Sequence, residues 1–370
     1  MAIYKIVVTG GPCAGKSTGM SRIETGLSTR GYKVFVIAET ATEVITGGLK
    51  VVELGLMPFQ KAILELQLAK EKVYLEAAKQ IKDRDVVILI DRGIMDARAF
   101  MSKNEFDELI DYFDLTLTEI RDNYDGIFHL KTAADGAEMY YTLANNAARS
   151  ETPEEARKVD RKIIAAWTGH PHLRVIDNSE DFDAKIDKLI NEIYSLLGEP
   201  IPLEIERKYL IKMPNIKELK EKYSATRLKI IQTYLNSTDD CERRIRQRGS
   251  HGSYSYFYTE KRKVTELSRV ESERKISKDE YLDYMMEADT SLRQIRKNRY
   301  CFVYQNNYIE MDVYPFWDDY AIVEVELTNE NQKVTLPPEI VVVREVTEDN
   351  RFKNNSLAKL DTSFEEIVQD

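Results

Sequence analysis

A segment near the start of the chain, Gly10 to Ser17, reads GGPCAGKS and fits the pattern G-x-x-x-x-G-K-[ST]. It lies between an apolar segment that we predict as a strand, IYKIVVTG, and a predicted helix from Lys16 to Arg30. Glycines allow backbone amides to curl around phosphate oxygens, and a helix N-terminus favours the same anions. We therefore predict a site for ATP or GTP in which Lys16 reaches the β- and γ-phosphates and Ser17 holds Mg²⁺. The predicted nucleotide-binding residues are Gly10, Gly11, Pro12, Cys13, Ala14, Gly15, Lys16, Ser17 and Thr18. The alternative is a glycine-rich turn that fits the pattern by chance.

Further residues in the first half could take part in phosphoryl transfer. Asp91 ends the apolar segment VVILID, and Arg92 follows it. A carboxylate that assists Mg²⁺ would lie at this strand end. Alternatively, Asp91 is a simple acid at the end of a strand. Glu39 ends the segment VIAE and could accept a proton from an attacking hydroxyl, or it could cap the next helix. The polar segment 144–161 could close as a lid that brings arginines to developing charge, or it could be a solvated loop and helix face. The predicted catalytic residues are Glu39, Asp91, Arg92, Arg149 and Arg157.

The second half shows a different pattern, in which charged residues alternate with others along several segments. In AIVEVEL, Glu324 and Glu326 share one face of an extended chain, opposite the apolar residues. The same alternation occurs in EIERKYL, RRIRQR, TEKRK, RVESERKI and YIEMDVY. One such strand would expose its charges to water, but the repetition favours a sheet that closes on itself with the charges inside.

A charged interior of this kind would suit a substrate with several negative charges together with divalent cations. Arginine and lysine bind phosphate oxygens, and carboxylates hold Mg²⁺ or Mn²⁺. The two signs of charge also offset each other's repulsion when they are packed closely. We therefore predict a metal-dependent site for a polyphosphate in the second half.

These residues require two kinds of scaffold. The first half alternates short apolar strands with helices, which predicts a doubly wound α/β domain with a parallel sheet over residues 1–198. A linker is predicted at 199–202, where the sequence reads EPIP. Residues 203–370 predict an antiparallel α+β domain of about eight strands that forms a tunnel-like β-barrel.

Composition excludes several classes of protein. The net charge of −10 argues against a general polyanion-binding protein, although a local basic cluster is compatible with it. The three cysteines and four histidines show no metal-binding spacing, and the cysteines suggest a reducing compartment. The N-terminus reads as a strand, and no apolar run approaches the roughly 20 residues of a membrane helix. We expect a cytoplasmic protein without a membrane partner; the sequence does not predict its oligomeric state.

The first 198 residues resemble a P-loop kinase-type domain of the kind found in nucleoside and nicotinamide riboside kinases, and the related AAA-type ATPase domain. The resemblance rests on GGPCAGKST, on VILIDRG and on the arginine-bearing segment 144–161. Nucleoside kinases often carry an acid-Arg-Ser sequence where this chain has Asp-Arg-Gly. The resemblance implies a nucleotide-dependent phosphotransferase or ATPase, and it leaves the phosphate acceptor open.

Residues of about 203–358 resemble the CYTH superfamily, the triphosphate tunnel metalloenzymes. The signature E-x-E-x-K is present as Glu204, Glu206 and Lys208, and acidic pairs match at Glu271/Glu273, Glu310/Asp312 and Glu324/Glu326. The resemblance implies a metal site formed by Glu204, Glu206, Asp312, Glu324 and Glu326. It implies triphosphate binding by Lys208, Arg244, Arg246, Lys261, Arg299 and Lys353.

The sequence thus predicts a bifunctional enzyme, in which a nucleotide-dependent phosphotransferase is joined to a divalent-metal-dependent triphosphatase. The predicted substrates of the second half are inorganic triphosphate, thiamine triphosphate or a nucleoside triphosphate, because the fold does not choose among them. One alternative is nucleic-acid end processing by a 5′-kinase and an RNA 5′-triphosphatase, which the overall acidity disfavours. Another is a nucleotide switch whose second half only senses polyphosphate.

Overall fold

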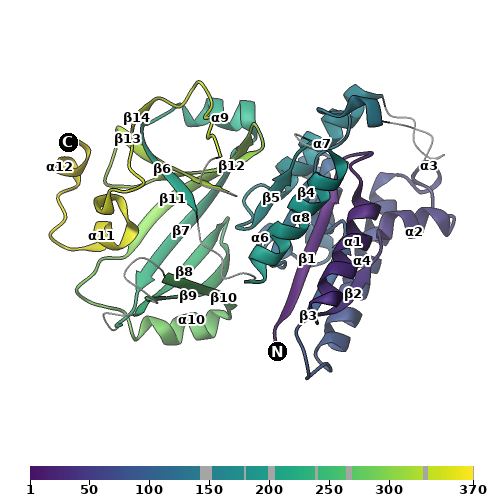
Figure 1. The fold of residues 1–370 in the computed structure, drawn as a ribbon, viewed down its shortest axis with the longest axis horizontal. Coiled ribbons are helices and arrows are strands. Elements are labelled where there is room, and N and C mark those ends of the chain that lie inside the picture. The colour runs from purple at the N-terminus through teal and green to yellow at the C-terminus, as the bar shows by residue number, and fades with distance from the viewer. Residues whose placement is uncertain are drawn as a thin grey trace. The chain divides into compact units, whose positions relative to one another are not determined.

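The computed structural model describes residues 1–141, 152–178, 181–198, 205–237, 241–263, 269–327 and 332–369. The chain divides into two units, Met1–Leu197 and Gly198–Asp370. Each unit has its own sheet and its own buried core (Figure 1). The predicted linker at 199–202 lies outside the described residues.

The first unit is built on a sheet of five parallel strands. The order across the sheet is β2-β3-β1-β4-β5. The strands are β1 (Ile3–Gly10), β2 (Lys33–Ile37), β3 (Val86–Asp91), β4 (Gly126–Leu130) and β5 (Leu173–Ile176). The central strands are almost entirely apolar because helices cover both faces of the sheet. The predicted parallel α/β fold is confirmed.

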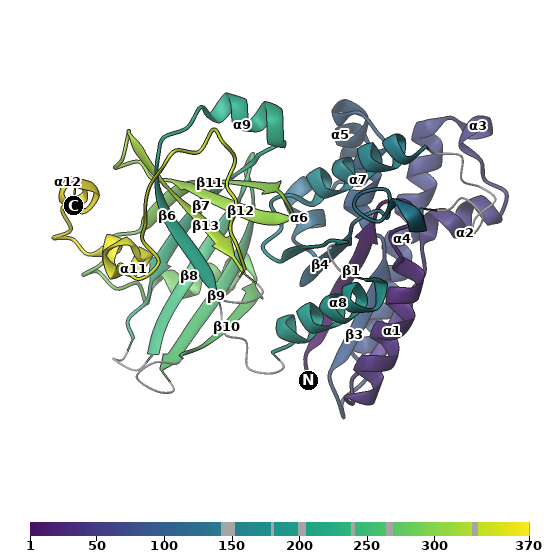
Figure 2. The ribbon, with the colours of Figure 1, turned by 45° about the horizontal axis from the view of Figure 1, so that its top comes forward.

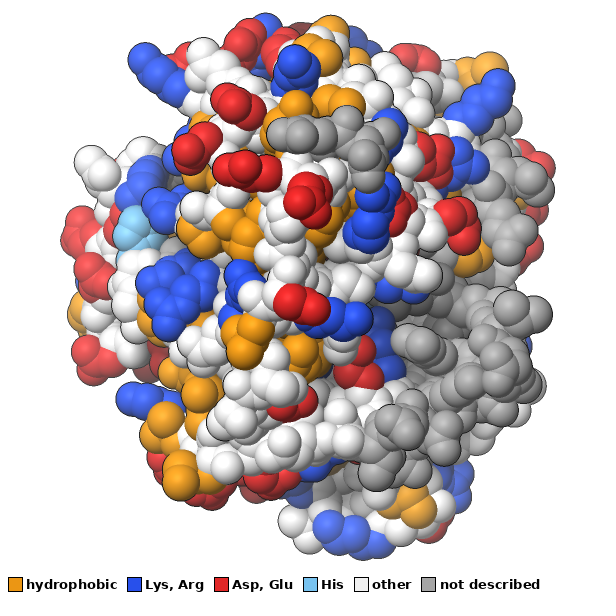
Figure 3. Space-filling model, turned by 90° about the vertical axis from the view of Figure 1, so that its left-hand side faces the viewer, with side chains coloured by type: hydrophobic (Ala, Val, Ile, Leu, Met, Phe, Trp, Pro, Cys, Tyr) orange, Lys and Arg blue, Asp and Glu red, His pale blue; other side chains and the backbone are white. Residues whose placement is uncertain are grey.

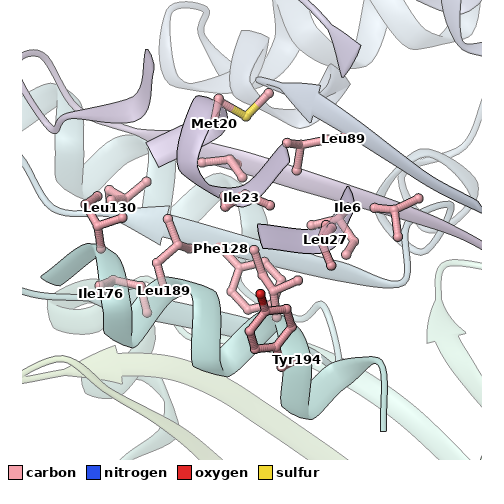
Figure 4. Packing of buried hydrophobic residues seen from close by; sticks show 14 of the residues in the cluster. Ile6, Met20, Ile23, Leu27, Leu89, Phe128, Leu130, Ile176, Leu189 and Tyr194 are labelled. Carbon is pink, nitrogen blue, oxygen red and sulfur yellow. The ribbon is translucent and has the colours of Figure 1, made fainter. Parts of the chain in front are cut away.

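Helices cover both faces of this sheet, and they position the residues at its carboxyl edge. Helices α1 and α8 pack over one face, where Ile23 and Leu189 contact Phe128 and its neighbours in one apolar cluster (Figure 4). Helices α4 and α7 contact the strands from the other side. The helices are α1 (Lys16–Thr29), α2 (Thr40–Thr46), α3 (Val51–Leu54), α4 (Leu56–Ala78), α5 (Lys103–Tyr112), α6 (Leu117–Arg121), α7 (Pro153–Trp167) and α8 (Phe182–Leu196), with short 3₁₀ segments η1 (Ile94–Ala99) and η2 (Glu138–Tyr140).

The second unit is built on one antiparallel sheet of nine strands. Its order is β10-β9-β8-β7-β11-β12-β13-β6-β14. The strands are β6 (Glu206–Lys212), β7 (Thr226–Tyr234), β8 (Cys241–Ser250), β9 (Ser253–Lys263), β10 (Arg269–Ile276), β11 (Ile295–Tyr304), β12 (Asn307–Val313), β13 (Tyr320–Glu326) and β14 (Val342–Glu345). The sheet is visibly curved (Figure 2).

The prediction of about eight strands closed into a barrel is therefore only partly right. The additional strand is β14, a short edge strand that pairs with β6 and has a register shift. Among the described residues, no backbone pairing joins the edge strands β10 and β14. The described part of the sheet therefore does not confirm the predicted closed tunnel.

The two faces of this sheet differ in chemistry, as the alternation in sequence predicts. Ala321, Val323 and Val325 of β13 join an apolar cluster with residues of β6, β11 and β12, and Leu219 of α9 covers it. The charged residues point to the other face. The remaining helices are α9 (Ile216–Tyr223), α10 (Lys278–Met285), α11 (Asn354–Ala358) and α12 (Phe364–Gln369), with the 3₁₀ segment η3 (Asn350–Phe352).

Two features bear on partners. No helix within the described ranges has the length and apolar character needed to cross a bilayer. On the face drawn in Figure 3, acidic and basic side chains lie interspersed with hydrophobic ones.

Candidate active sites

The phosphate-binding loop has the backbone geometry that its glycines predict. The strand β1 ends at Gly10 and α1 begins at Lys16, so the loop joins a strand to a helix N-terminus. Gly15 has φ +85°, and a Cβ atom there would lie 2.4 Å from the ring of Phe182. A Cβ atom on Gly10 would lie 2.3 Å from the carbonyl oxygen of Leu130. Both positions therefore require glycine. Ser17 and Thr18 are exposed in the first turn of α1.

Lys16, Asp91, Glu39 and Arg92 form one electrostatic cluster at the carboxyl edge of the sheet. Burial and the nearby Arg92 lower the pKa of the Lys16 ammonium, although Asp91 and Glu39 oppose this shift. Arg92 Nε lies 2.7 Å from Glu39 Oε1, and Arg92 Nη1 lies 3.3 Å from Asp96 Oδ1. Burial raises the pKa of Glu39, but Arg92 and Lys16 outweigh it, so the pKa is lowered. Glu39 is thus held as a carboxylate beside the loop.

Asp91 has a buried carboxylate oxygen at the carboxyl end of β3. Its Oδ1 accepts no hydrogen bond from the described residues, which is costly for a carboxylate unless another group occupies the position. Burial raises the pKa of Asp91, and Lys16 opposes this effect. A Mg²⁺ ion that is also held by Ser17 would satisfy this oxygen, so the residues fit the predicted metal. Arg92, which follows Asp91, has φ +63°, an uncommon conformation for a residue other than glycine.

The segment of the predicted arginine lid is helical over its described part. Residues 153–161 belong to α7, whose side chains Asp160, Ile163 and Trp167 are buried in the first unit. Arg157 donates to the carbonyl oxygen of Ala134 at 2.6 Å, so it anchors the helix to the preceding loop. Within residues 153–161 only Ala156 and Asp160 are buried, so the described part has the solvated helix face of the second alternative, and closure as a lid stays a prediction. Arg149 lies outside the described residues.

In the second unit, Arg299 joins acids from two neighbouring strands. Its guanidinium contacts Asp312 at 2.6 Å and Glu324 at 2.6 Å, and it also pairs with Glu310. Lys297, two residues earlier on the same face, lies 2.5 Å from Asp312. Arg299 and Asp312 are 7% and 0% exposed, so this face is not turned to bulk solvent although it is charged.

Lys208 extends the charged network towards the start of β6. Its ammonium lies 3.0 Å from both Glu206 and Glu324. Burial alone would lower the pKa of Lys208, but the two carboxylates raise it. Burial alone would raise the pKa of Glu324, but Lys208, Arg299 and Lys297 hold it well below its usual range. These groups are therefore fixed in their charged forms.

A second group of charges lies on β8, β9 and β10. Arg246 binds Glu273 at 2.8 Å, and Thr259 donates to the same carboxylate at 2.9 Å. Arg244 precedes Arg246 by two residues on β8, and Lys261 follows Thr259 by two residues on β9, so each shares a face with its neighbour. Backbone register places Arg244 opposite Thr259.

The remaining predicted residues of the second unit lie in different surroundings. Lys353 is exposed and lies before α11 on no strand of the sheet. Glu326 is exposed and lies directly opposite Glu206 in the register of β13 and β6. Two like charges in this arrangement repel each other, which favours a cation between them. Glu204 lies outside the described residues, and within the described part no three acid, histidine or cysteine side chains form a metal-binding group. The donor chemistry suits Mg²⁺ or Mn²⁺, and the structure supplies only part of the ligand set.

Comparison with known proteins identifies relatives for both parts of the chain. Residues 5–185 match a family model described as an AAA domain. An inorganic triphosphatase from Nitrosomonas europaea is 34% identical over 158 residues, which are 42% of this chain and 96% of that protein. Over this part of its length, the chain belongs to the inorganic triphosphatase family.

Two solved structures are also similar. A crystal structure of an inorganic triphosphatase shares 30% sequence identity, with a TM-score of 0.31, over 42% of this chain and 94% of that one. A deoxyadenosine kinase from M. mycoides, solved with bound dATP, shares 19% identity, with a TM-score of 0.36, over 51% of this chain and 98% of that one.

Sequence reasoning missed several residues that support the two sites. Lys297 of β11 shares a face with Arg299 at a spacing of two, which could have identified it. Asp96 follows the predicted Asp91–Arg92 pair closely, and Trp167 donates to it at 3.1 Å. Asp160 and Lys185 contact the phosphate-binding loop. No local signal in the sequence marks them, because their partners are distant along the chain.

Proposed function

We propose that this chain is a bifunctional enzyme that joins a nucleotide-dependent phosphotransferase or ATPase to a divalent-metal-dependent triphosphatase. The observation that carries the proposal is the 34% identity to an inorganic triphosphatase over 96% of that protein. It is supported by the buried, charged face of the second sheet, where Lys208, Arg246 and Arg299 lie among carboxylates.

In the second unit, the basic residues divide into two roles. Lys208, Arg244, Arg246 and Lys261 would bind the phosphate oxygens of inorganic triphosphate or another short triphosphate. Arg299 differs in degree, because its guanidinium pairs with three carboxylates, those of Asp312, Glu310 and Glu324, whereas Lys208 pairs with two and Arg246 with that of Glu273. We therefore assign the pair of Arg299 and Asp312 to holding the network in place, instead of the direct phosphate and metal contacts that the resemblance implies.

The divalent ion would be held by Glu206, Glu326 and Glu324, with Glu204 completing the set. When bound, Mg²⁺ or Mn²⁺ polarises a phosphoryl oxygen and offsets the charge that develops during cleavage. Lys208 contacts two of these carboxylates, so it links the metal ligands to the phosphate-binding residues. Its positive charge would stabilise the negative charge on the substrate.

In the first unit, the loop and Lys16 would bind the phosphates of ATP or GTP, and Ser17 and Asp91 would hold Mg²⁺. Glu39 is the base that would accept a proton from the attacking group, because Arg92 keeps it ionised beside the loop. Arg92 would in turn offset negative charge that develops on the phosphate being transferred.

A phosphate-release screen tests the proposal. The wild-type chain, Lys16→Ala and Glu206→Ala would be assayed with inorganic triphosphate, thiamine triphosphate, nucleoside triphosphates and RNA with a 5′-triphosphate. Glu206→Ala should lose release from the short triphosphate and should keep nucleotide binding. Lys16→Ala should show the opposite pattern. Glu221→Ala is the control, because Glu221 is an exposed acid on α9. Unchanged release in Glu206→Ala would refute the assignment.

A further inference from the structure

The phosphate-binding loop is fastened from outside by side chains that belong to other elements. Thr132 Oγ1 donates to the carbonyl oxygen of Pro12 at 2.5 Å, and the backbone N–H of Ala133 donates to that of Cys13 at 3.4 Å. Lys185 Nζ donates to the carbonyl oxygen of Ala14 at 3.1 Å. Three successive loop carbonyls are therefore bound from outside the loop.

These contacts fix the direction of the N–H groups that would bind phosphate. In a trans peptide, the C=O of one residue and the N–H of the next point in opposite directions. Holding the carbonyls of Pro12, Cys13 and Ala14 against their outer partners therefore turns the N–H groups of Cys13, Ala14 and Gly15 to the opposite side. Successive N–H groups that point the same way form an anion-binding concavity.

Asp160 fixes the beginning of the loop. One of its oxygens, Oδ1, accepts from the N–H of Gly11 at 3.0 Å, from the N–H of Thr132 at 3.0 Å and from His129 Nε2 at 3.1 Å. The side chain is nearly completely buried in α7. Because the N–H of Gly11 donates to this carboxylate, it is not available to a phosphate. The N–H groups that can bind phosphate therefore begin after Gly11.

Lys185 fixes the end of the loop and adds charge. Its ammonium is buried and donates to three acceptors, which are the carbonyl oxygens of Ala14 and Lys131 and Asn178 Oδ1. These three described acceptors carry no net charge, and a bound phosphate would supply a nearby negative charge. Burial lowers its pKa to about 8, Asp160 and Asp177 act against this shift, and Lys131 adds to it.

We propose that Asp160 and Lys185 are positioning residues that hold the loop in the conformation that binds nucleotide phosphates. The proposal rests on the nucleotide site assigned above. It goes beyond that site because neither residue belongs to the loop, and each acts through the backbone it holds.

The test is the dissociation constant of MgATP and MgGTP, measured by calorimetry on the full chain. Lys185→Met and Asp160→Leu should each weaken binding about 10- to 100-fold, the range expected for loss of a charge-assisted hydrogen bond. Lys188→Met is the matched control, because Lys188 is on the same helix and its ammonium pairs with Asp177 at 3.5 Å, away from the loop carbonyls. It should change the constant by less than about twofold.

A pH series separates positioning from a general effect on folding. Lys185 loses its proton as pH rises through about 8. Wild-type affinity should therefore fall between pH 7 and pH 9 more steeply than that of Lys185→Arg, which keeps its charge. Any contribution of Lys16 to the pH dependence is common to both proteins. The thermal unfolding of each variant is also measured without nucleotide, to detect any general loss of stability.

The outcomes distinguish this inference from the function on which it rests. If wild type binds nucleotide, Lys16→Ala does not, and Lys185→Met binds like wild type, the positioning role is refuted and the nucleotide site stands. Identical pH profiles for wild type and Lys185→Arg would also refute it, even if Lys185→Met unfolds too easily to be measured. If wild type binds neither nucleotide, the proposed function fails and the inference fails with it.

Discussion

Replacement of Arg299 by methionine should destabilise the second unit strongly. The substitution keeps most of the side-chain volume and removes the cation that contacts Asp312, Glu310 and Glu324. Asp312 is fully buried and, among the described residues, would keep Lys297 as its one charged partner. Removal of one member of a buried ion pair typically costs about 3–5 kcal/mol, so we expect the free energy of unfolding to fall by about that amount.

The assay is urea unfolding followed by tryptophan fluorescence. The chain has two tryptophans, Trp167 in the first unit and Trp317 in the second, so a Trp167→Phe background reports on the second unit alone. The control is Arg227→Met, because Arg227 is an exposed arginine of the same sheet that hydrogen-bonds Asn298. Its effect should stay within about 0.5 kcal/mol.

The pH dependence of this effect has a definite sign. Burial raises the pKa of Glu324, but Lys208, Arg299 and Lys297 lower it well below its usual value. A carboxyl group of this kind stabilises the fold above its unfolded pKa, and this contribution is lost as pH falls through the folded value. Arg299→Met has less of this stabilisation to lose. The difference in unfolding free energy between wild type and Arg299→Met should therefore shrink below about pH 4.5. A loss under about 1 kcal/mol that does not change with pH would refute the structural role of Arg299.

Three further predictions concern the two sites. Asp91→Asn should raise the Mg²⁺ concentration needed for half-maximal nucleotide binding about tenfold, because it removes the charge of the carboxylate whose buried Oδ1 would contact the ion; an unchanged Mg²⁺ titration would contradict this. Gly11→Ala should abolish nucleotide binding in a filter assay, because its Cβ atom would lie 2.5 Å from Asp160 Oδ1; retained binding would show that the loop can move. Lys208→Met should lower the initial rate of triphosphate hydrolysis about 10²- to 10³-fold, and a rate within twofold of wild type would exclude a role for Lys208.

The first unit could be predicted well where local pattern and fold agree. The loop motif lies between an apolar strand and a helix, and the parallel sheet follows from short apolar strands between helices. Segment 144–161 was less well defined. The Thr152–Glu155 capping box and Pro153 mark a helix start in the sequence, but the charged residues of this segment left both a lid and a solvated helix face open. Burial of Asp160 depends on His129 and Gly11, which no local pattern reveals.

In the second unit, alternation predicted which residues share a face but could not predict how they are paired. Arg299 is surrounded by acids from β12 and β13, and this arrangement depends on strand register. The alternation in the sequence therefore cannot distinguish an arginine that binds phosphate from an arginine that is already paired with carboxylates. Sheet closure is also set by strand order and curvature, and the short strand β14 has too few residues to give a clear periodic signal.

The most direct test of the account is the hydrolysis of inorganic triphosphate by the full chain, followed by ³¹P NMR with Mg²⁺ present and then with the metal chelated. The account predicts that the triphosphate resonances are replaced by those of pyrophosphate and orthophosphate when Mg²⁺ is present. It also predicts that they persist after chelation and in Glu206→Ala. Triphosphate that survives incubation with wild type and Mg²⁺, or that disappears equally fast with Glu206→Ala, would contradict the central claim.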